Sequence, residues 1–279
     1  MTVSPVNALP EARALTRAPT AHPWLALRDV RVAIGARVLI DQLTLQVQAG
    51  QRWVVLGRNG AGKTRLLEVL LGLHAPAVGT IDLDGAPLRG MPLAAAARLR
   101  AFLPQHAPVP FGETVLQAVL IGRHPYRRST ASVDEHADVM LALQALEVVH
   151  LRQHAARTVT ELSGGERQRV ALAALLVQQT PLLLLDEPLN HLDLAQQQGV
   201  LDHLRQLSQQ GRAVVCTLHD INQALALATH VVLLDGAAGA QCGTAAELLT
   251  VAHLQRIFDV RLCEVVQGGQ RCFLPVTGA

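Results

Sequence analysis

Apolar and polar residues alternate strictly in the first part of the chain. Residues 43–47 read L-T-L-Q-V, and residues 80–84 read T-I-D-L-D before a glycine. A period of two is typical of strands that bury one face and leave the other in water. The pattern therefore predicts an antiparallel sheet within residues 25–84.

Four other apolar runs are continuous rather than alternating, at residues 53–56, 182–185, 213–218 and 231–234. Short continuous runs between helical patterns are typical of strands buried on both faces of a parallel sheet. A glycine-rich loop follows Leu56, two carboxylates follow Leu185, and His219 follows Leu218. Ligands of open α/β sheets bind beyond the carboxyl ends of the strands, so we expect these three features to converge at one edge.

Helical patterns fill the stretch between these strands. Residues 88–161 are predicted to be helical, with a capping box at residues 132–135 that opens a helix containing Val139, Leu143 and Leu146. We expect a helical subdomain inserted in an α/β core. Weak alternation around Gly268 and Gly269 predicts a hairpin at the end of the chain.

Composition excludes several classes of protein. The formal charge of +2 is too small for a nucleic-acid footprint, and a chain of 279 residues that is 50% hydrophobic can bury a core. No run approaches the ~20 apolar residues of a membrane-spanning helix. The four cysteines show no C-x-x-C spacing, which favours reduced thiols in a cytosol over a metal cluster or disulfides.

The glycine-rich loop has a specific sequence. Residues 57–64, G-R-N-G-A-G-K-T, fit the pattern G-x-x-x-x-G-K-S/T between a predicted strand and a predicted helix. In such a phosphate loop the backbone N–H groups surround phosphate oxygens, Lys63 reaches the β- and γ-phosphates, and Thr64 can bind Mg²⁺. The alternative is a glycine-rich turn with a solvated lysine.

The two carboxylates after residues 182–185 suit the same chemistry. In hydrolysis of a nucleoside triphosphate, one carboxylate holds the metal and another polarises the attacking water. We assign Asp186 to Mg²⁺ and Glu187 to the water. The alternative is a strand end that carries solvated acids.

Residues 162–169, L-S-G-G-E-R-Q-R, place Ser163 as the N-cap of a helix whose first N–H groups form a second anion site. Alone, this stretch would also fit an ordinary capping turn. With the phosphate loop upstream and the acidic strand downstream, it resembles the signature of ATP-binding-cassette (ABC) ATPases, and the likeness spans residues 25–258.

The resemblance implies a P-loop, RecA-like ATPase core with an antiparallel β subdomain and an inserted helical subdomain at about 88–165. It implies an ATPase domain over 25–262. The mixed composition of the first residues, which lack the apolar stretch of a secretory signal, predicts a flexible leader over 1–24, and residues 263–279 are predicted to be a tail or hairpin. By the same likeness Gln105 senses the metal and γ-phosphate, Asp193 is the aspartate of the loop after the acidic strand, and His219 contacts the γ-phosphate. The candidate catalytic residues are Glu187, His219 and Gln105, the candidate metal ligands are Thr64, Gln105 and Asp186, and the candidate ATP contacts are Gly57, Arg58, Asn59, Gly60, Ala61, Gly62, Lys63, Thr64, Ser163, Gly164, Gly165 and Asp193.

Recognition of adenine departs from the family pattern. The family usually stacks adenine on an aromatic residue in the first strands, and the aligned position here is Ile34. Trp24 could replace it if the leader folds back, or it could be a packing anchor. His150 and His154 lack a third ligand at metal-binding spacing and are interpreted as structural.

The chain has one phosphate loop and one signature, and in the family it resembles the signature faces the nucleotide of a partner. The resemblance therefore implies a head-to-tail homodimer that closes two ATP sites. The resemblance further implies an importer ATPase on the cytoplasmic face of the membrane, whose permease docks on the helical subdomain and whose complex includes a substrate-binding protein. Residues 114–116, 121–125 and 189–197 resemble the branch that imports iron-siderophores, haem and vitamin B12. A soluble cassette ATPase acting on ribosomes or DNA and a P-loop small-molecule kinase are the competing functions; near-neutral charge and a single cassette are against the first, and the signature, Gln105 and His219 are against the second.

Overall fold

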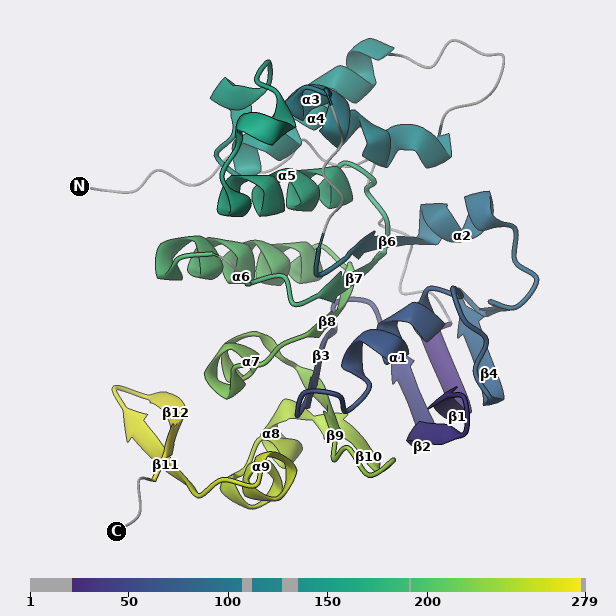
Figure 1. Cartoon of the computed structure of the whole chain (residues 1–279), viewed down its shortest axis with the longest axis vertical. Coiled ribbons are helices and arrows are strands. Elements are labelled where there is room, and N and C mark those ends of the chain that lie inside the picture. The colour runs from purple at the N-terminus through teal and green to yellow at the C-terminus, as the bar shows by residue number, and fades with distance from the viewer. Residues whose placement is uncertain (1–21, 107–111, 127–134, 191, 277–279) are drawn as a thin grey trace.

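The computed structural model describes residues 22–106, 112–126, 135–190 and 192–276 (Figure 1). The leader predicted over 1–24 therefore lies outside the described residues up to residue 21, as do residues 132–134 of the predicted capping box and His191. None of the helices in the described part of the chain is both long and apolar enough to cross a membrane.

The first part of the chain forms a four-stranded antiparallel sheet, as predicted. Its strand order is β2-β1-β4-β5, and its members are β1 (Leu25–Ile34), β2 (Arg37–Val47), β4 (Val78–Leu83) and β5 (Ala86–Pro87). In β2, Leu43 and Val47 are buried while Thr44 is exposed. The alternation in the sequence thus reflects one buried face and one exposed face.

A second sheet of six strands runs through the middle of the molecule in the order β10-β9-β3-β8-β7-β6 (Figure 1). The four continuous apolar runs are four of its strands, paired in parallel as predicted. The strands are β3 (Arg52–Gly57), β6 (Arg100–Leu103), β7 (Leu182–Asp186), β8 (Ala213–Thr217), β9 (His230–Leu234) and an antiparallel edge strand, β10 (Ala240–Thr244).

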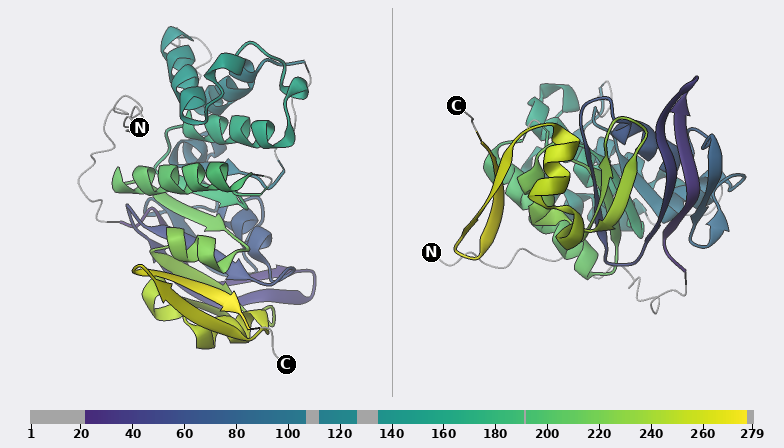
Figure 2. Two further views of the ribbon diagram at one scale, coloured as in Figure 1. Left: turned by 90° about the vertical axis from the view of Figure 1, so that its left-hand side faces the viewer. Right: turned by 90° about the horizontal axis from the view of Figure 1, so that it is seen from below.

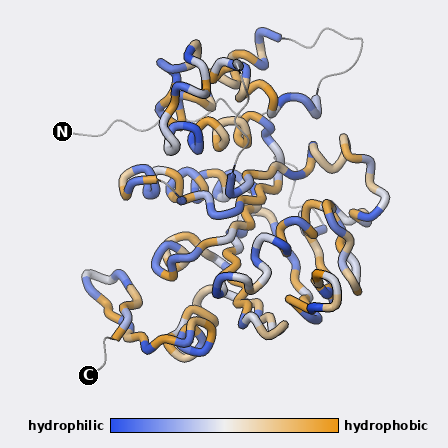
Figure 3. The backbone as a smooth tube through the Cα atoms, viewed as in Figure 1, coloured by the Kyte–Doolittle hydropathy of each residue, from blue (hydrophilic) through white to orange (hydrophobic). Residues whose placement is uncertain are grey.

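The side chains of this sheet divide between two cores, which explains why its strands are apolar throughout. Leu183 and Leu185 pack on one face with the helices of the second half of the chain, whereas Leu182 and Leu184 pack on the other face with the antiparallel sheet. Figure 3 shows the apolar segments gathered in these central strands. All five residues of β7 are buried.

The helices cover both faces and one end of the larger sheet (Figure 1). Helices α6 and α7 lie on one side of it and α1 on the other, while α3, α4 and α5 gather at one end. The helices are α1 (Lys63–Leu70), α2 (Leu93–Leu99), α3 (Val115–Leu120), η1 (Ile121–Tyr126), α4 (Glu135–Val148), η2 (Arg152–His154), η3 (Val159–Glu161), α5 (Gly164–Leu176), α6 (Leu194–Gln209), α7 (Ile221–Leu227), α8 (Ala245–Leu248) and α9 (Val251–Phe258).

One strand corrects the prediction that residues 88–161 are helical. Residues 100–103 form β6, which pairs in parallel with β7 through Arg100 with Leu182 and Leu103 with Leu185. Four residues that follow α2 directly carry almost no periodicity of their own. Pairing with a long-range partner therefore decides their conformation.

The predicted hairpin lies near the end of the described residues, at the end of the molecule away from α3, α4 and α5 (Figure 2). Strand β11 (Leu262–Gln267) pairs antiparallel with β12 (Gln270–Pro275). The turn residues Gly268 and Gly269 have φ values of 59° and 79°. A two-residue turn with positive φ at both positions suits glycine and matches the twist of the strands.

Candidate functional site

The phosphate loop joins β3 to α1 at the carboxyl edge of the larger sheet. Gly62, the N-cap of α1, has φ 101°, and a Cβ at this position would lie 3.1 Å from Cβ of Leu39. The positive φ therefore favours glycine at this point of the loop, and an added Cβ would also press on the Leu39 side chain. The loop ends on the N-terminus of α1, where N–H groups and the helix dipole favour a phosphate.

Lys63 lies inside the loop and is only 6% exposed. Its Nζ donates to the carbonyl oxygens of Gly57 at 2.9 Å and Arg58 at 3.3 Å. Burial lowers the pKa of the Lys63 ammonium, and the negative charges of Glu187 and Asp186 oppose this shift. The Lys63 ammonium thus interacts electrostatically with both carboxylates. Thr64, the next residue, is exposed in the first turn of α1.

The two carboxylates occupy different environments at the end of β7. Asp186 is 1% exposed, and its Oδ1 accepts a hydrogen bond of 2.6 Å from the hydroxyl of Thr217. Glu187 follows with φ 50°, a left-handed conformation that is uncommon for a residue with a side chain. Such backbone strain is concentrated at functional sites.

Three segments meet at the carboxylate of Glu187. Nε2 of Gln105, which follows β6, donates to Oε2 at 2.7 Å. The Asn190 side chain donates to the same oxygen, and Nε2 of His219, which follows β8, bonds to Oε1. The expected convergence at one sheet edge is therefore confirmed for the strand-end residues, and Glu187 is its centre.

Two members of this cluster were not predicted from the sequence. Asn190 lies in a stretch assigned to the loop before Asp193, and its contact with Glu187 was not expected. Thr217 lies within the continuous apolar run 213–218, and the sequence pattern predicts no role for it. Its signal was a hydroxyl at the last position of the otherwise apolar strand A-V-V-C-T, directly before the loop that carries His219.

Ser163 caps α5, as predicted. Its Oγ accepts from the backbone N–H of Glu166 at 3.2 Å, and its own N–H donates to Oε2 of Glu166 at 2.8 Å. The bond from the Ser163 N–H, followed by that from its side chain, lowers the pKa of Glu166. Gly164 is exposed. Within the described residues, no hydrogen bond or ion pair joins this first turn to the phosphate loop, so the two motifs do not meet directly in one chain.

Asp193 has a local role in this chain as the N-cap of α6. Its Oδ1 accepts from the backbone N–H of Gln196 at 2.8 Å. The next residue, Leu194, is 83% exposed, which makes the start of α6 an apolar protrusion on the surface.

The two candidates for adenine contact differ in exposure. Ile34 is 56% exposed at the end of β1. Trp24 is 6% exposed and belongs to the core under the antiparallel sheet. Trp24 is therefore a packing anchor, and its use as an adenine platform is wrong. Of the histidines interpreted as structural, His150 is exposed and His154 lies 4.0 Å from Oε1 of Glu166.

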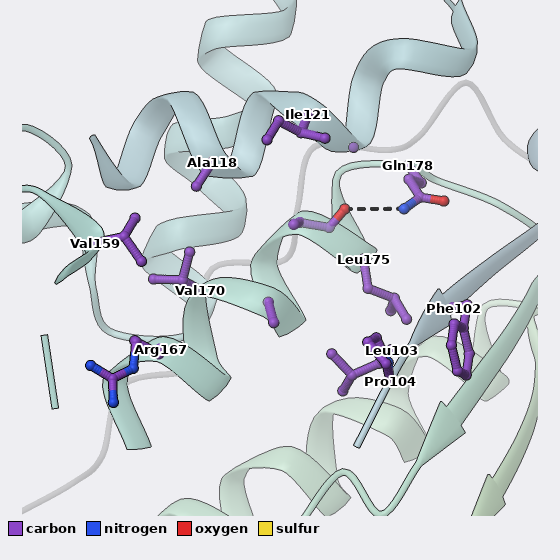
Figure 4. Close-up of a pocket in the computed structure, with 13 residues that line it drawn as sticks. Phe102, Leu103, Pro104, Ala118, Ile121, Val159, Arg167, Val170, Leu175 and Gln178 are labelled. Carbon is purple, nitrogen blue, oxygen red and sulfur yellow. Dashed lines mark hydrogen bonds between the residues drawn. The ribbon is translucent and has the colours of Figure 1, made fainter. Parts of the chain in front are cut away.

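A mainly apolar cavity of about 280 Å³ lies where β6 and the residues before Gln105 meet α3, η1 and α5 (Figure 4). Figure 4 shows Leu103 and Pro104 on one side of it and Ala118 and Ile121 on the other. Ile121 is 55% exposed at the mouth. The cavity therefore joins the helical end of the molecule to the segment that leads to the Glu187 cluster.

A phosphate loop on a parallel strand, with carboxylates beyond the neighbouring strand, places the chain in the class of P-loop nucleoside triphosphatases. The model of the ABC transporter family matches residues 40–190, just over half of the sequence. The chain belongs to this family, and the predictions of an ATP-binding cassette fold and of an ATPase are confirmed.

Known relatives of the chain narrow the class of ABC protein to which it is similar. The chain is 38% identical over 240 residues to the achromobactin transport ATP-binding protein of Dickeya dadantii, covering 86% of this chain and 88% of that protein. It is 40% identical over 243 residues to the hemin import ATP-binding protein of Nocardia farcinica, covering 86% and 83%. A solved metal-chelate type ABC transporter in an inward-facing conformation is similar with a TM-score of 0.78 and 32% identity, over 90% of this chain and 97% of that one. These findings favour an import subunit over an ATPase acting on ribosomes or nucleic acid.

Proposed function

We propose that this chain is the ATP-hydrolysing subunit of an importer for an iron-siderophore, haem or cobalamin, acting through a separate membrane permease. The names of the relatives support the importer. The observation that carries the enzymatic part is the set of hydrogen bonds around Glu187, because three segments from three strand ends hold one carboxylate beside the phosphate loop.

The residues around Asp186 fit a magnesium ion. Mg²⁺ prefers hard oxygen ligands, and the candidates are the Asp186 carboxylate, the Thr64 hydroxyl and the amide oxygen of Gln105. Oδ1 of Asp186 is held by Thr217, and Oδ2 accepts no hydrogen bond from the described residues. Bound Mg²⁺ would neutralise charge on the β- and γ-phosphates. Residues 57–64 would hold those phosphates through backbone N–H groups and the Lys63 ammonium.

Glu187 is the proposed general base. Gln105 and Asn190 donate to one of its carboxylate oxygens and His219 bonds to the other, which fixes the plane of the group. A fixed carboxylate can polarise a water aligned with the γ-phosphate without first reorganising. In this proposal His219 and Gln105 also contact the γ-phosphate.

The second half of each ATP site comes from a second copy of the chain. The backbone N–H groups of Gly164 and Gly165 lie in the first turn of α5, where no helical partner exists for them. They form an anion site with Ser163, and Asp193 and Leu194 border it in the proposed head-to-tail dimer. ATP is then part of the dimer interface.

The cavity at Ile121 is the proposed docking point for the permease. It is apolar, open at the surface and continuous with the segment that carries Gln105. Movement of a docked permease helix would therefore act on a residue bonded to Glu187. The complete transporter includes a substrate-binding protein, and the chain lies on the cytoplasmic face of the membrane, peripheral to it.

The test uses Glu187→Gln, which keeps the shape of the side chain and removes its basicity. We expect ATPase activity to fall about 10²- to 10⁴-fold. With ATP and Mg²⁺ this variant should elute as a dimer in gel filtration, and Ser163→Glu in the same background should stay monomeric. Wild-type turnover by Glu187→Gln would refute the base, and a monomer in ATP would refute the shared site.

A further inference from the structure

Thr217 contacts both halves of the acidic pair at the end of β7. It is the last residue of β8, fully buried at 0% exposure, and lies opposite Asp186 in the parallel ladder between β8 and β7. Its Oγ1 donates to Oδ1 of Asp186 at 2.6 Å and accepts from the backbone N–H of Glu187 at 2.9 Å. A hydroxyl has one hydrogen to donate, so the direction of both bonds is fixed.

The bond to the Glu187 N–H acts on strained backbone. Glu187 has φ 50°, and a left-handed residue with a side chain persists only where its surroundings hold it. This conformation turns the chain out of β7 and presents the side chain to Gln105, Asn190 and His219. The Thr217 hydroxyl is the partner of the peptide N–H at that turn, and it thereby supports the orientation of the proposed base.

We propose that Thr217 is a positioning residue for hydrolysis, whose single hydroxyl orients the Asp186 carboxylate toward its metal and holds the backbone of Glu187 in place. The inference rests on the proposed function. Thr217 is buried behind the two acids and acts through them. A change at Thr217 should therefore alter the dependence on Mg²⁺ as well as the rate.

The test compares two buried threonines that lie near opposite ends of β7. Thr217→Val replaces the hydroxyl with a methyl group of the same shape. Thr180→Val is the matched control, because Thr180 is also 0% exposed and its Oγ1 also makes a hydrogen bond, to the carbonyl of Leu182 at 3.1 Å. Thr180 precedes β7, at the opposite end of the strand from Asp186.

Three quantities are measured on the full-length protein: the ATPase rate against Mg²⁺ concentration, the affinity for a fluorescent ATP analogue with Mg²⁺ or with EDTA, and the midpoint of thermal unfolding. For Thr217→Val we expect the half-saturating Mg²⁺ concentration to rise about 10- to 100-fold and kcat to fall. Analogue affinity should weaken with Mg²⁺ and stay at the wild-type value in EDTA. Thr180→Val should lower the unfolding midpoint alone.

Conservative variants separate the hydroxyl from packing. Thr217→Ser keeps the hydroxyl and should restore the Mg²⁺ dependence, whereas Thr217→Cys, a weak donor, should give an intermediate defect even if Thr217→Val fails to fold. Wild-type Mg²⁺ dependence in the Val or Cys variant, or a Ser variant as defective as Val, would overturn the inference. A wild-type protein that does not hydrolyse ATP would instead refute the proposed function.

Discussion

His203 gives the fold a stability that should depend on pH in a defined direction. The side chain lies on α6 in a cavity of about 400 Å³ between α5 and α6, and its Nε2 has no hydrogen-bond partner among the described residues. Burial, and secondarily the positive charge of Arg212, lower its pKa from 6.5 to about 4. The cavity is also lined by two charged side chains, Arg169 from α5 and Asp202 from α6, whereas Arg212 does not line it.

The direction of this pH dependence follows from proton binding. Between pH 4 and 6.5 the unfolded chain binds a proton at this histidine and the folded chain does not, so stability is complete above pH 6.5 and is lost as pH falls. Because the pKa of His203 is lowered from 6.5 to about 4, its contribution to the free energy of unfolding has a limit of about 3 kcal/mol. Of this contribution, about 2 kcal/mol is lost between pH 7 and pH 5.

Urea unfolding at pH 7, 6 and 5 measures this loss. His203→Gln removes the titrating group, so its free energy of unfolding should fall about 2 kcal/mol less than that of the wild type over this range. His150→Gln is the control, because His150 lines the same cavity but is exposed, and it should behave as the wild type. A His203→Gln protein that loses as much stability as the wild type would refute this account of His203.

Three further predictions test other contacts. Lys63→Ala removes the ammonium from the phosphate loop, so ATP binding in an equilibrium assay should be lost without loss of the fold; wild-type affinity would contradict the assignment. Arg123→Met leaves the Asp138 carboxylate, bonded to Arg123 Nε at 2.7 Å and itself 9% exposed, without its cation. This should cost about 3 kcal/mol in urea unfolding, and Asp138→Leu added to it should restore most of the loss; an additive double variant would refute the pairing. Asn222→Ala removes two hydrogen bonds to the backbone of Phe273, at 2.8 and 3.1 Å, so amide exchange in β12 should accelerate. Asn222→Asp keeps the acceptor for the Phe273 N–H and should give a smaller effect, while unchanged exchange in the Ala variant would show that other contacts hold the hairpin.

Features that depend on neighbouring residues in the sequence were predictable. The phosphate loop could be recognised because glycines, a lysine and the flanking strand and helix occur within a few residues of one another. The cap at Ser163 and the hairpin at Gly268 and Gly269 are local for the same reason. The continuous apolar strands were predictable because burial on both faces leaves only apolar residues at positions 182–185 of β7.

Features that depend on strand register were not predictable. Residues 100–103 become a strand only because β7 offers an open edge. Thr217 reaches Asp186 only because the two residues are opposite each other in the ladder of β8 and β7. Asn190 contacts Glu187 after a turn whose left-handed start has no marker in the sequence. The sequence shows which groups Thr217 and Asn190 can use in hydrogen bonds, but it does not show which residues those groups contact.

The division of contacts indicates what a second chain would have to supply. Among the described residues, each hydrogen bond to the Glu187 carboxylate comes from its own chain, so alignment of the proposed base does not require dimerisation. The side chains of Ser163 and Asp193, in contrast, accept hydrogen bonds as N-caps of their own helices. Among the described residues, no hydrogen bond or ion pair links the first turn of α5 to the phosphate loop of the same chain. A partner would therefore contribute phosphate binding and closure, whereas the geometry of the proposed base is already set within one chain. Loss of the partner's Ser163 should accordingly weaken ATP-driven association more than it disturbs the environment of Glu187.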